Sequence, residues 1–208
     1  MKSPNAAIAT AAIIMAGTAH ADVTQIGEFD SLQFEGFDDE RWVFERDTKE
    51  VFGGIGEVFA TGNGWIHTTG SWGFSSGDWR GSTRAYDGNM LGNTRGSINY
   101  RFDQTQHSFG GFFATIADVE GGIVKFYGSD DSLVGQSTLA AAVGGEWSWN
   151  GWALQDGFNR VEVTGNYKDG AGGFLMHDSM RVSNTTIPAP GALALIITGG
   201  LITTRRRR

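Results

Sequence analysis

The chain has 208 residues and no cysteine, and its 23 Asp and Glu residues outnumber its 16 Lys and Arg residues, for a formal net charge of −7. This length suits one compact domain with a sizeable core, and the lack of cysteine excludes stabilisation by disulfide bonds. Without Lys2 and the four C-terminal arginines, 11 basic residues face the same 23 acidic ones, and so acidic a domain excludes nucleic acid and anionic lipid as partners.

The first 21 residues have the pattern of a secretory signal peptide. Lys2 supplies a basic start, residues 6–16 are mostly Ala and Ile, and the small residues Ala19 and Ala21 mark a cleavage site. The composition changes at once at Asp22, which argues against a buried N-terminal helix. We therefore predict export, with cleavage after Ala21 and a mature domain that spans residues 22–184.

The mature domain is predicted to be all-β. The chain contains 32 Gly and 3 Pro residues, and no long window has a helical period. Short alternating runs are instead separated by turns rich in Gly, Asn and Asp. About ten strands at this spacing favour a two-sheet β-sandwich, with a jelly roll as the expected connectivity, while a barrel and a β-helix stay open as alternatives.

Three stretches have clear strand patterns. Residues 57–70 predict a hairpin with a Gly-Asn-Gly turn. Residues 110–117 are apolar at both parities, as in a central strand that is covered on both faces. Residues 122–140 predict a second hairpin, which turns at Asp130 and Asp131.

Six of the seven tryptophans stand in two groups. The first, Trp65, Trp72 and Trp79, lies in a Gly- and Ser-rich stretch, and the second consists of Trp147, Trp149 and Trp152. Trp147 and Trp149 would project from one face of a strand. Exposed rings on a rigid strand can stack against the C–H faces of sugars, although tryptophans also fill sandwich cores. We therefore consider Trp147, Trp149 and Trp152 as a candidate polysaccharide-binding platform.

The last predicted strand, residues 173–182, contains an acidic residue in an apolar row. Phe174, Met176, Met180 and Val182 share their parity with Asp178. A carboxylate on the inward face needs a cation, an arginine or backbone donors, because an unpaired buried charge is costly. His177 would point to the opposite face, so it is a poor co-ligand for Asp178.

This strand resembles the last strand of many β-sandwich carbohydrate-binding modules, in which a late aspartate lies beside a structural Ca²⁺. The resemblance implies a calcium site at Asp178. Ca²⁺ takes six to eight oxygen ligands, so other segments would have to contribute. The candidate partners are Glu35, Asp38, Asp39 and Asp118. A bond between Asp178 and a neighbouring loop or an arginine is the alternative.

The C-terminal stretch has the order of a sorting signal. Pro188-Ala189-Pro190 precedes an uncharged apolar segment at about residues 191–204, which is followed by Arg205, Arg206, Arg207 and Arg208. As a helix this segment would span roughly 20 Å, against roughly 30 Å of hydrocarbon. The two prolines mark a helix start, and the arginines favour the cytoplasmic side.

A signal peptide combined with such a tail resembles the bacterial PEP-CTERM proteins, which exosortases process. The resemblance covers residues 185–208, and Ala189 stands where that family has Glu. It implies an exosortase-type partner, transient anchoring of the tail helix in the inner membrane, and then display at the cell surface or in the extracellular matrix.

The sequence contains no recognisable catalytic motif. An H-E-x-x-H metal motif is absent, and His67, His107 and His177 are isolated in the chain. We therefore predict an exported, non-catalytic surface or matrix protein whose domain binds polysaccharide or takes part in adhesion. The alternatives are a polysaccharide-acting hydrolase or lyase, and a structural matrix protein without a ligand.

Overall fold

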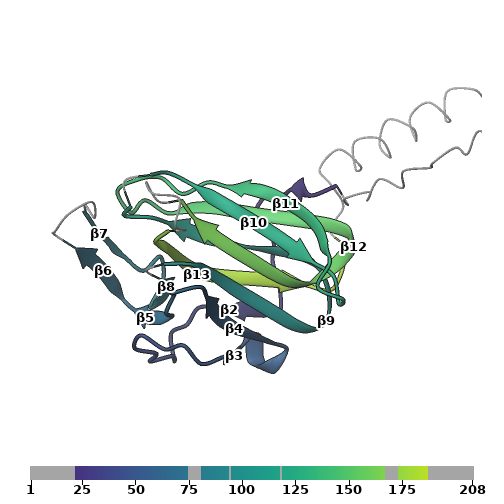
Figure 1. Cartoon of the computed structure of the whole chain (residues 1–208), viewed down its shortest axis with the longest axis horizontal. Coiled ribbons are helices and arrows are strands. Elements are labelled where there is room, and N and C mark those ends of the chain that lie inside the picture. Colours follow the sequence, from purple (N-terminus) through teal and green to yellow (C-terminus); the bar gives the residue numbers. More distant parts are fainter. Residues whose placement is uncertain (1–21, 75–80, 94, 118, 167–172, 187–208) are drawn as a thin grey trace, which may run out of the picture.

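The computed structural model describes residues 22–74, 81–93, 95–117, 119–166 and 173–186 (Figure 1). The predicted signal peptide, the predicted sorting signal from residue 187 onward, Trp79 and Asp118 lie outside the described residues. Within the described ranges, no helix is long and apolar enough to cross a membrane.

The described chain consists of short strands and two very long ones, so the all-β prediction is confirmed. A single 3-10 turn, η1 (Phe52–Gly54), is present in the described part. The strands are β1 (Thr24–Gln25), β2 (Gln33–Glu35), β3 (Lys49–Val51), β4 (Gly56–Thr61), β5 (His67–Thr69), β6 (Ser71–Phe74), β7 (Gly81–Arg84), β8 (Met90–Asn93), β9 (Ser97–Ala114), β10 (Gly122–Tyr127), β11 (Leu133–Leu139), β12 (Ser148–Gly165) and β13 (Leu175–Ser183).

Eleven strands form one large sheet, with the main order β11-β10-β12-β9-β13-β8-β5, and β6 pairs with β7 in a small second sheet. The 18-residue strands β9 and β12 run through both layers of the molecule. Strand β9 pairs with β12 along both of its halves; on its other side, its first half pairs with β4 and its second half pairs with β13. Strands distant in sequence thus become neighbours, as Greek-key and jelly-roll connectivity requires.

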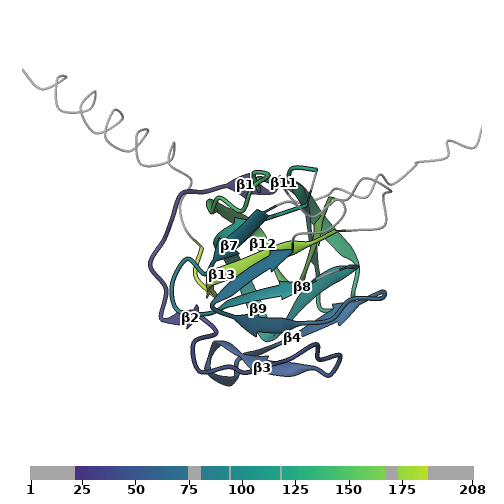
Figure 2. The same cartoon turned by 90° about the vertical axis from the view of Figure 1, so that its left-hand side faces the viewer.

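The two halves of the large sheet face each other across the main core, which confirms the predicted sandwich. Trp152 in one half contacts Phe126 in the other, with ring centroids 6.1 Å apart. Tyr100 and His177 meet in the same way, and the Tyr100 hydroxyl lies 3.0 Å from His177 Nδ1. Figure 2, turned by 90°, shows the strands curving round this core.

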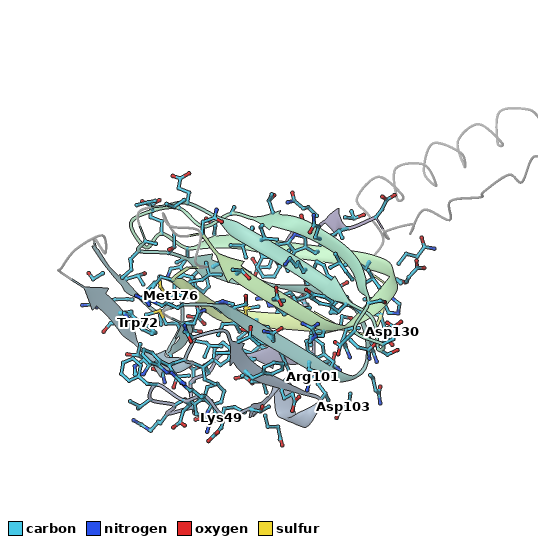
Figure 3. All side chains as sticks on the ribbon, in the orientation of Figure 1. Lys49, Trp72, Arg101, Asp103, Asp130 and Met176 are labelled. Atoms are coloured by element: carbon cyan, nitrogen blue, oxygen red, sulfur yellow. The ribbon has the colours of Figure 1, made fainter. Side chains whose placement is uncertain are left out.

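Residues 110–117 are buried on both faces, as predicted. Phe113 belongs to the main core, whereas Ala114 belongs to a second, smaller core. This second core also contains Met176 of β13 and Trp72 of the small sheet, which lie beside each other in Figure 3. The small sheet therefore covers part of the outer face of the large one.

One of the two predicted hairpins is correct. Strands β10 and β11 pair antiparallel around the Asp130-Asp131 turn. The hairpin predicted within residues 57–70 is wrong, because β4 pairs with β3 and β9, whereas β5 pairs with β8. The turn between β4 and β5 instead connects two strands that pair with different partners, so long-range pairing prevails over the local turn signal.

Strand β13 carries an irregularity that changes which side chains share a face. Its register with β9 shifts between Asp178 and Arg181, and Ser179 has a positive φ of 49°. Such a bulge inserts one extra residue and reverses the parity beyond it. Phe174 and Met176 therefore lie in the second core with Asp178 on their face, and the remaining pair, Met180 and Val182, packs in the main core. The prediction that all five share one face is wrong for this reason.

Candidate functional site

The outer face of β12, β9 and β13 carries an aromatic row that the strand register aligns. Trp149 of β12 lies opposite Phe112 of β9, which lies opposite Asp178 of β13. The adjacent row is formed in the same order by Gly151, Gly110 and Arg181. The row that begins with Trp149 and Phe112 thus lies beside a row that begins with two glycines, which have no side chain.

Trp149 lies across this glycine row. A Cβ added at Gly110 would approach the indole to 2.9 Å, and one added at Gly151 would approach it to 3.0 Å. The indole Nε1–H donates to the Ile26 carbonyl at 3.3 Å, and the Arg181 guanidinium lies 5.4 Å from the ring centroid. The two glycines therefore let the half-buried ring lie close to the sheet, where its polar edge is fixed.

Tyr86 supplies the exposed ring of the site. It stacks almost parallel on Phe112, with centroids 3.7 Å apart and an interplanar angle of 14°. Its side chain keeps 51% of its surface exposed, whereas Phe112 beneath it keeps 9%. The buried Phe112 ring thus supports the Tyr86 ring, which presents an accessible aromatic face.

The loop that carries Tyr86 is held at one end by Asp178. The Asp178 Oδ2 accepts the backbone N–H of Tyr86 at 2.7 Å and that of Asp87 at 3.2 Å. Burial raises the pKa of Asp178 from 3.8 to about 7, and the N–H groups of Asp87, Tyr86 and Ser179 oppose that rise. The carboxylate is fully buried, so its position fixes the backbone at Tyr86.

Asp38 holds the other end of the same loop. Its Oδ1 accepts the backbone N–H of Asn89 at 2.8 Å, and its carbonyl accepts the Asn89 side-chain amide at 3.1 Å. The segment from Tyr86 to Asn89 is therefore clamped between two aspartates from different parts of the chain.

Trp147 completes the aromatic group. Its Nε1–H donates to the Arg84 carbonyl at 2.8 Å, and its ring meets Tyr86 edge-on at 6.4 Å. Like Trp149 it is half-buried. We call Tyr86, Phe112, Trp147 and Trp149 together the Tyr86 surface.

Trp152 does not belong to this surface, and its prediction as a binding residue is wrong. Its side chain is completely buried and packs against Phe109, Phe113 and Phe126 in the main core. The reason is parity: Trp149 and Trp152 are three residues apart on one strand, so they point to opposite faces.

The predicted calcium ligands are used in other ways or lie apart. Glu35 accepts the backbone N–H groups of Phe37 at 2.9 Å and Phe52 at 2.8 Å, and Asp39 is exposed. No group of three or more His, Asp or Glu side chains suited to a metal occurs among the residues that the structure describes. The bond between Asp178 and a loop matches the alternative to calcium, and the calcium site itself stays a prediction.

Sequence reasoning missed Tyr86 and the clamp around it. The only local signal was the Asp-Gly turn directly after Tyr86, which marks a loop but not what the loop covers. The arrangement offers rigid aromatic faces beside polar groups, including Arg181, which is paired with Glu28 at 2.8 Å. Such a surface can bind flat apolar faces of a polar ligand.

No protein-family model matches the chain, and no curated protein matches its sequence. Solved structures of similar fold include the CBM22-1 xylan-binding domain of Xyn10C from Paenibacillus barcinonensis, with 11% identity, a TM-score of 0.42, and coverage of 82% of this chain and all of that one. A family 29 carbohydrate-binding module complexed with mannohexaose has 12% identity and a TM-score of 0.38, and covers 79% of this chain and 92% of its own. A family 11 carbohydrate-binding module from Clostridium thermocellum has 10% identity and a TM-score of 0.37, over 76% of this chain and all of that one.

Proposed function

We propose that the domain binds polysaccharide through the Tyr86 surface and does not catalyse a reaction. The observation that carries this proposal is the position of Tyr86. Half of its surface is exposed, its ring stacks on Phe112, and a buried aspartate accepts its backbone N–H. An exposed ring does not contribute the stabilisation that its burial would give to the fold. Because the ring is already held in one position, less conformational entropy is lost when a ligand binds.

The ligand class follows from charge. The mature domain has an excess of acidic residues, and Arg181 at the site is already paired with Glu28. An anionic polymer would therefore be repelled, whereas a neutral polysaccharide presents C–H faces to the rings and hydroxyls to the neighbouring polar groups.

The setting of this binding is proposed from the sequence alone. The signal-peptide pattern of residues 1–21 supports export, and the tail from Pro188 to Arg208 supports handling by an exosortase-type enzyme after transient anchoring in the inner membrane. The protein would then hold polysaccharide at the cell surface or in the extracellular matrix.

Native electrophoresis in gels that contain a dissolved polysaccharide tests the binding. The protein should be slowed by at least one of the neutral polymers hydroxyethylcellulose, galactomannan and dextran, and not by anionic alginate. Unchanged mobility in all three neutral gels would overturn the proposal and leave a structural protein without a ligand. Release of reducing sugars from the polymer that slows it would favour the alternative, a hydrolase.

A further inference from the structure

A second group of aromatic side chains, in which Phe44 is exposed and Trp65 and His67 are half-buried, lies at the β5 end of the sheet. Here the segment around Phe44 runs beside β5, because Glu45 and Ile66 exchange two backbone hydrogen bonds of 2.9 Å. Val43 keeps 61% of its surface exposed and Phe44 keeps 51%, the same fraction as Tyr86. Two large apolar side chains in succession are thus directed to solvent by a segment that backbone pairing holds in place.

Phe44 is held in a conformation that its residue type avoids. Its φ is 54°, in the left-handed region, where a side chain with a Cβ is strained. Its ring stacks on His67 with centroids 4.7 Å apart, and it meets Trp65 edge-on at 5.9 Å. Strain in an exposed aromatic residue concentrates at binding sites, because folding alone gains little from it.

The group is nearly uncharged and has one cation at its edge. Burial lowers the pKa of His67, so its ring is neutral at neutral pH. The Arg46 guanidinium lies 5.5 Å from the Trp65 ring centroid and is exposed to solvent. Aromatic faces with a hydrogen-bond donor beside them suit the same ligand chemistry as the Tyr86 surface, namely a sugar ring with its hydroxyls.

This group is separate from the Tyr86 surface. Strands β13 and β8 lie between β5 and the strand that carries Phe112, a lateral distance of roughly 14 Å. The Trp72 ring fills part of that interval: it contacts His67 edge-on at 5.1 Å, and a Cβ added at Gly92 of β8 would come within 2.3 Å of it. Trp72 is itself buried, so it contributes to the packing beneath both places and not to a continuous exposed surface.

We propose that Phe44, Trp65 and His67, with Arg46 at their edge, form a second polysaccharide-binding site, so that one domain holds two polymer segments and can cross-link them. The inference rests on the proposed function, because it assigns the same ligand class to a second place. A second copy of this domain is a less suitable occupant, since both copies carry the same large excess of acidic residues.

Four proteins test this inference: the wild type, Tyr86→Ala, Phe44→Ala and the double variant. Two measurements are made with hydroxyethylcellulose, galactomannan and dextran: retardation in polymer-containing native gels, and the viscosity of the polymer solution after protein is added. Each single variant should still be retarded but should lose the viscosity increase, because one site binds without cross-linking. The double variant should migrate as in a gel without polymer.

Phe44→Asn accompanies Phe44→Ala, because asparagine tolerates the left-handed backbone and keeps the segment in place if alanine disturbs it. Wild-type viscosity and retardation in both Phe44 variants would overturn the second site. So would complete loss of retardation in Tyr86→Ala alone, which would leave the proposed function intact with a single site. A wild type that none of the three polymers retards would instead refute the proposed function itself.

Discussion

At the scale of single residues, Asp178 has the most consequential position in the molecule. It stands at the bulge of β13, faces the second core, and is completely buried, yet two of its backbone donors come from the loop that exposes Tyr86. The neighbouring His177 points into the main core, where burial lowers its pKa to about 3 and keeps it neutral. Two adjacent titratable side chains, His177 and Asp178, thus point to opposite faces of one strand.

The raised pKa of Asp178 predicts how stability depends on pH. Between about pH 4 and about pH 7 the folded protein keeps a proton on Asp178 that the unfolded chain gives up, so this contribution to stability is lost as pH rises. The shift from 3.8 to about 7 corresponds to at most about 4 kcal/mol. Asp178→Asn stays neutral and keeps an oxygen acceptor, so it should lack this dependence.

Urea unfolding of the wild type and Asp178→Asn at about pH 4.5 and about pH 8 measures this pH dependence of stability. The variant is the reference, because the contributions of all other titrating groups cancel in the comparison. The stability of the wild type relative to the variant should decrease toward the higher pH. A relative stability that is constant or increases would show that the carboxylate is not held in a costly charged state.

A calcium ion at Asp178 would have a different signature. A ligand that binds only the folded state stabilises it by RT ln(1 + [L]/Kd), about 2.7 kcal/mol at a hundredfold excess over Kd. If the predicted site exists, a chelator should lower the wild-type melting temperature, calcium should restore it, and Asp178→Asn should respond much less. Melting curves of the wild type that neither chelator nor calcium shifts would eliminate the site.

Residue patterns in the sequence predicted part of this site. The acidic residue in an apolar row was recognised, and so was the need to satisfy it with a cation, an arginine or backbone donors. The bulge at Ser179 could not be foreseen, because a serine at positive φ leaves no pattern in the sequence. The placement of Trp152 failed because it was grouped with its neighbours by spacing in the chain instead of by parity.

At the scale of elements, the loop from Tyr86 to Asn89 links the fold to the proposed function. Its conformation is imposed by carboxylates from β13 and from the segment after β2, so its ring is in place before a ligand arrives. The sequence predicted strands with strong alternation and one hairpin with an acidic turn. It did not predict this loop or the pairing of β4 with β9, because both depend on partners that are far away in the chain.

The clamp predicts that a residue outside the aromatic group affects binding. Asp38→Ala removes the acceptor for the Asn89 N–H, and the loosened loop should bind polysaccharide roughly 2- to 10-fold more weakly, the entropic cost of ordering it again. Asp39→Ala is the matched control, because it removes the same charge from the neighbouring residue, which is also exposed. Dissociation constants from gel retardation in graded polymer concentrations compare the two.

Equal affinities for the Asp38 and Asp39 variants would mean that charge and not loop order matters. A loss of affinity in Asp38→Ala with an unchanged melting temperature would assign Asp38 to positioning of the loop.

At the scale of the whole molecule, composition and periodicity sufficed for the fold class, because a cysteine-free, glycine-rich acidic chain with alternating runs has few ways to bury a core except between sheets. They did not predict that β9 and β12 pass through both layers, since an 18-residue strand reads in sequence as two shorter ones. The position of the Tyr86 surface follows from that arrangement, because the outer face of these strands is where the rings meet.

The C-terminal tail makes a prediction that concerns location only. Replacement of Arg205 to Arg208 by Ser removes the positive charge that would orient and retain the apolar segment, so sorting or surface retention should be disturbed. The melting temperature of the domain should not change. Cell fractionation and the size of the mature protein provide the readout, and wild-type fractionation with wild-type processing would count against a sorting signal.

The proposed function depends above all on the binding of a neutral polysaccharide by Tyr86, so the decisive measurement is the affinity of Tyr86→Ala for the polymer that retards the wild type. Ile123→Ala is the matched control, because Ile123 of β10 is a large apolar residue with 44% of its surface exposed on a strand outside the Tyr86 surface. The dissociation constant should rise at least about tenfold for Tyr86→Ala, about 1.4 kcal/mol, at an unchanged melting temperature, and should stay at the wild-type value for Ile123→Ala. An affinity of Tyr86→Ala equal to that of the wild type would contradict the account.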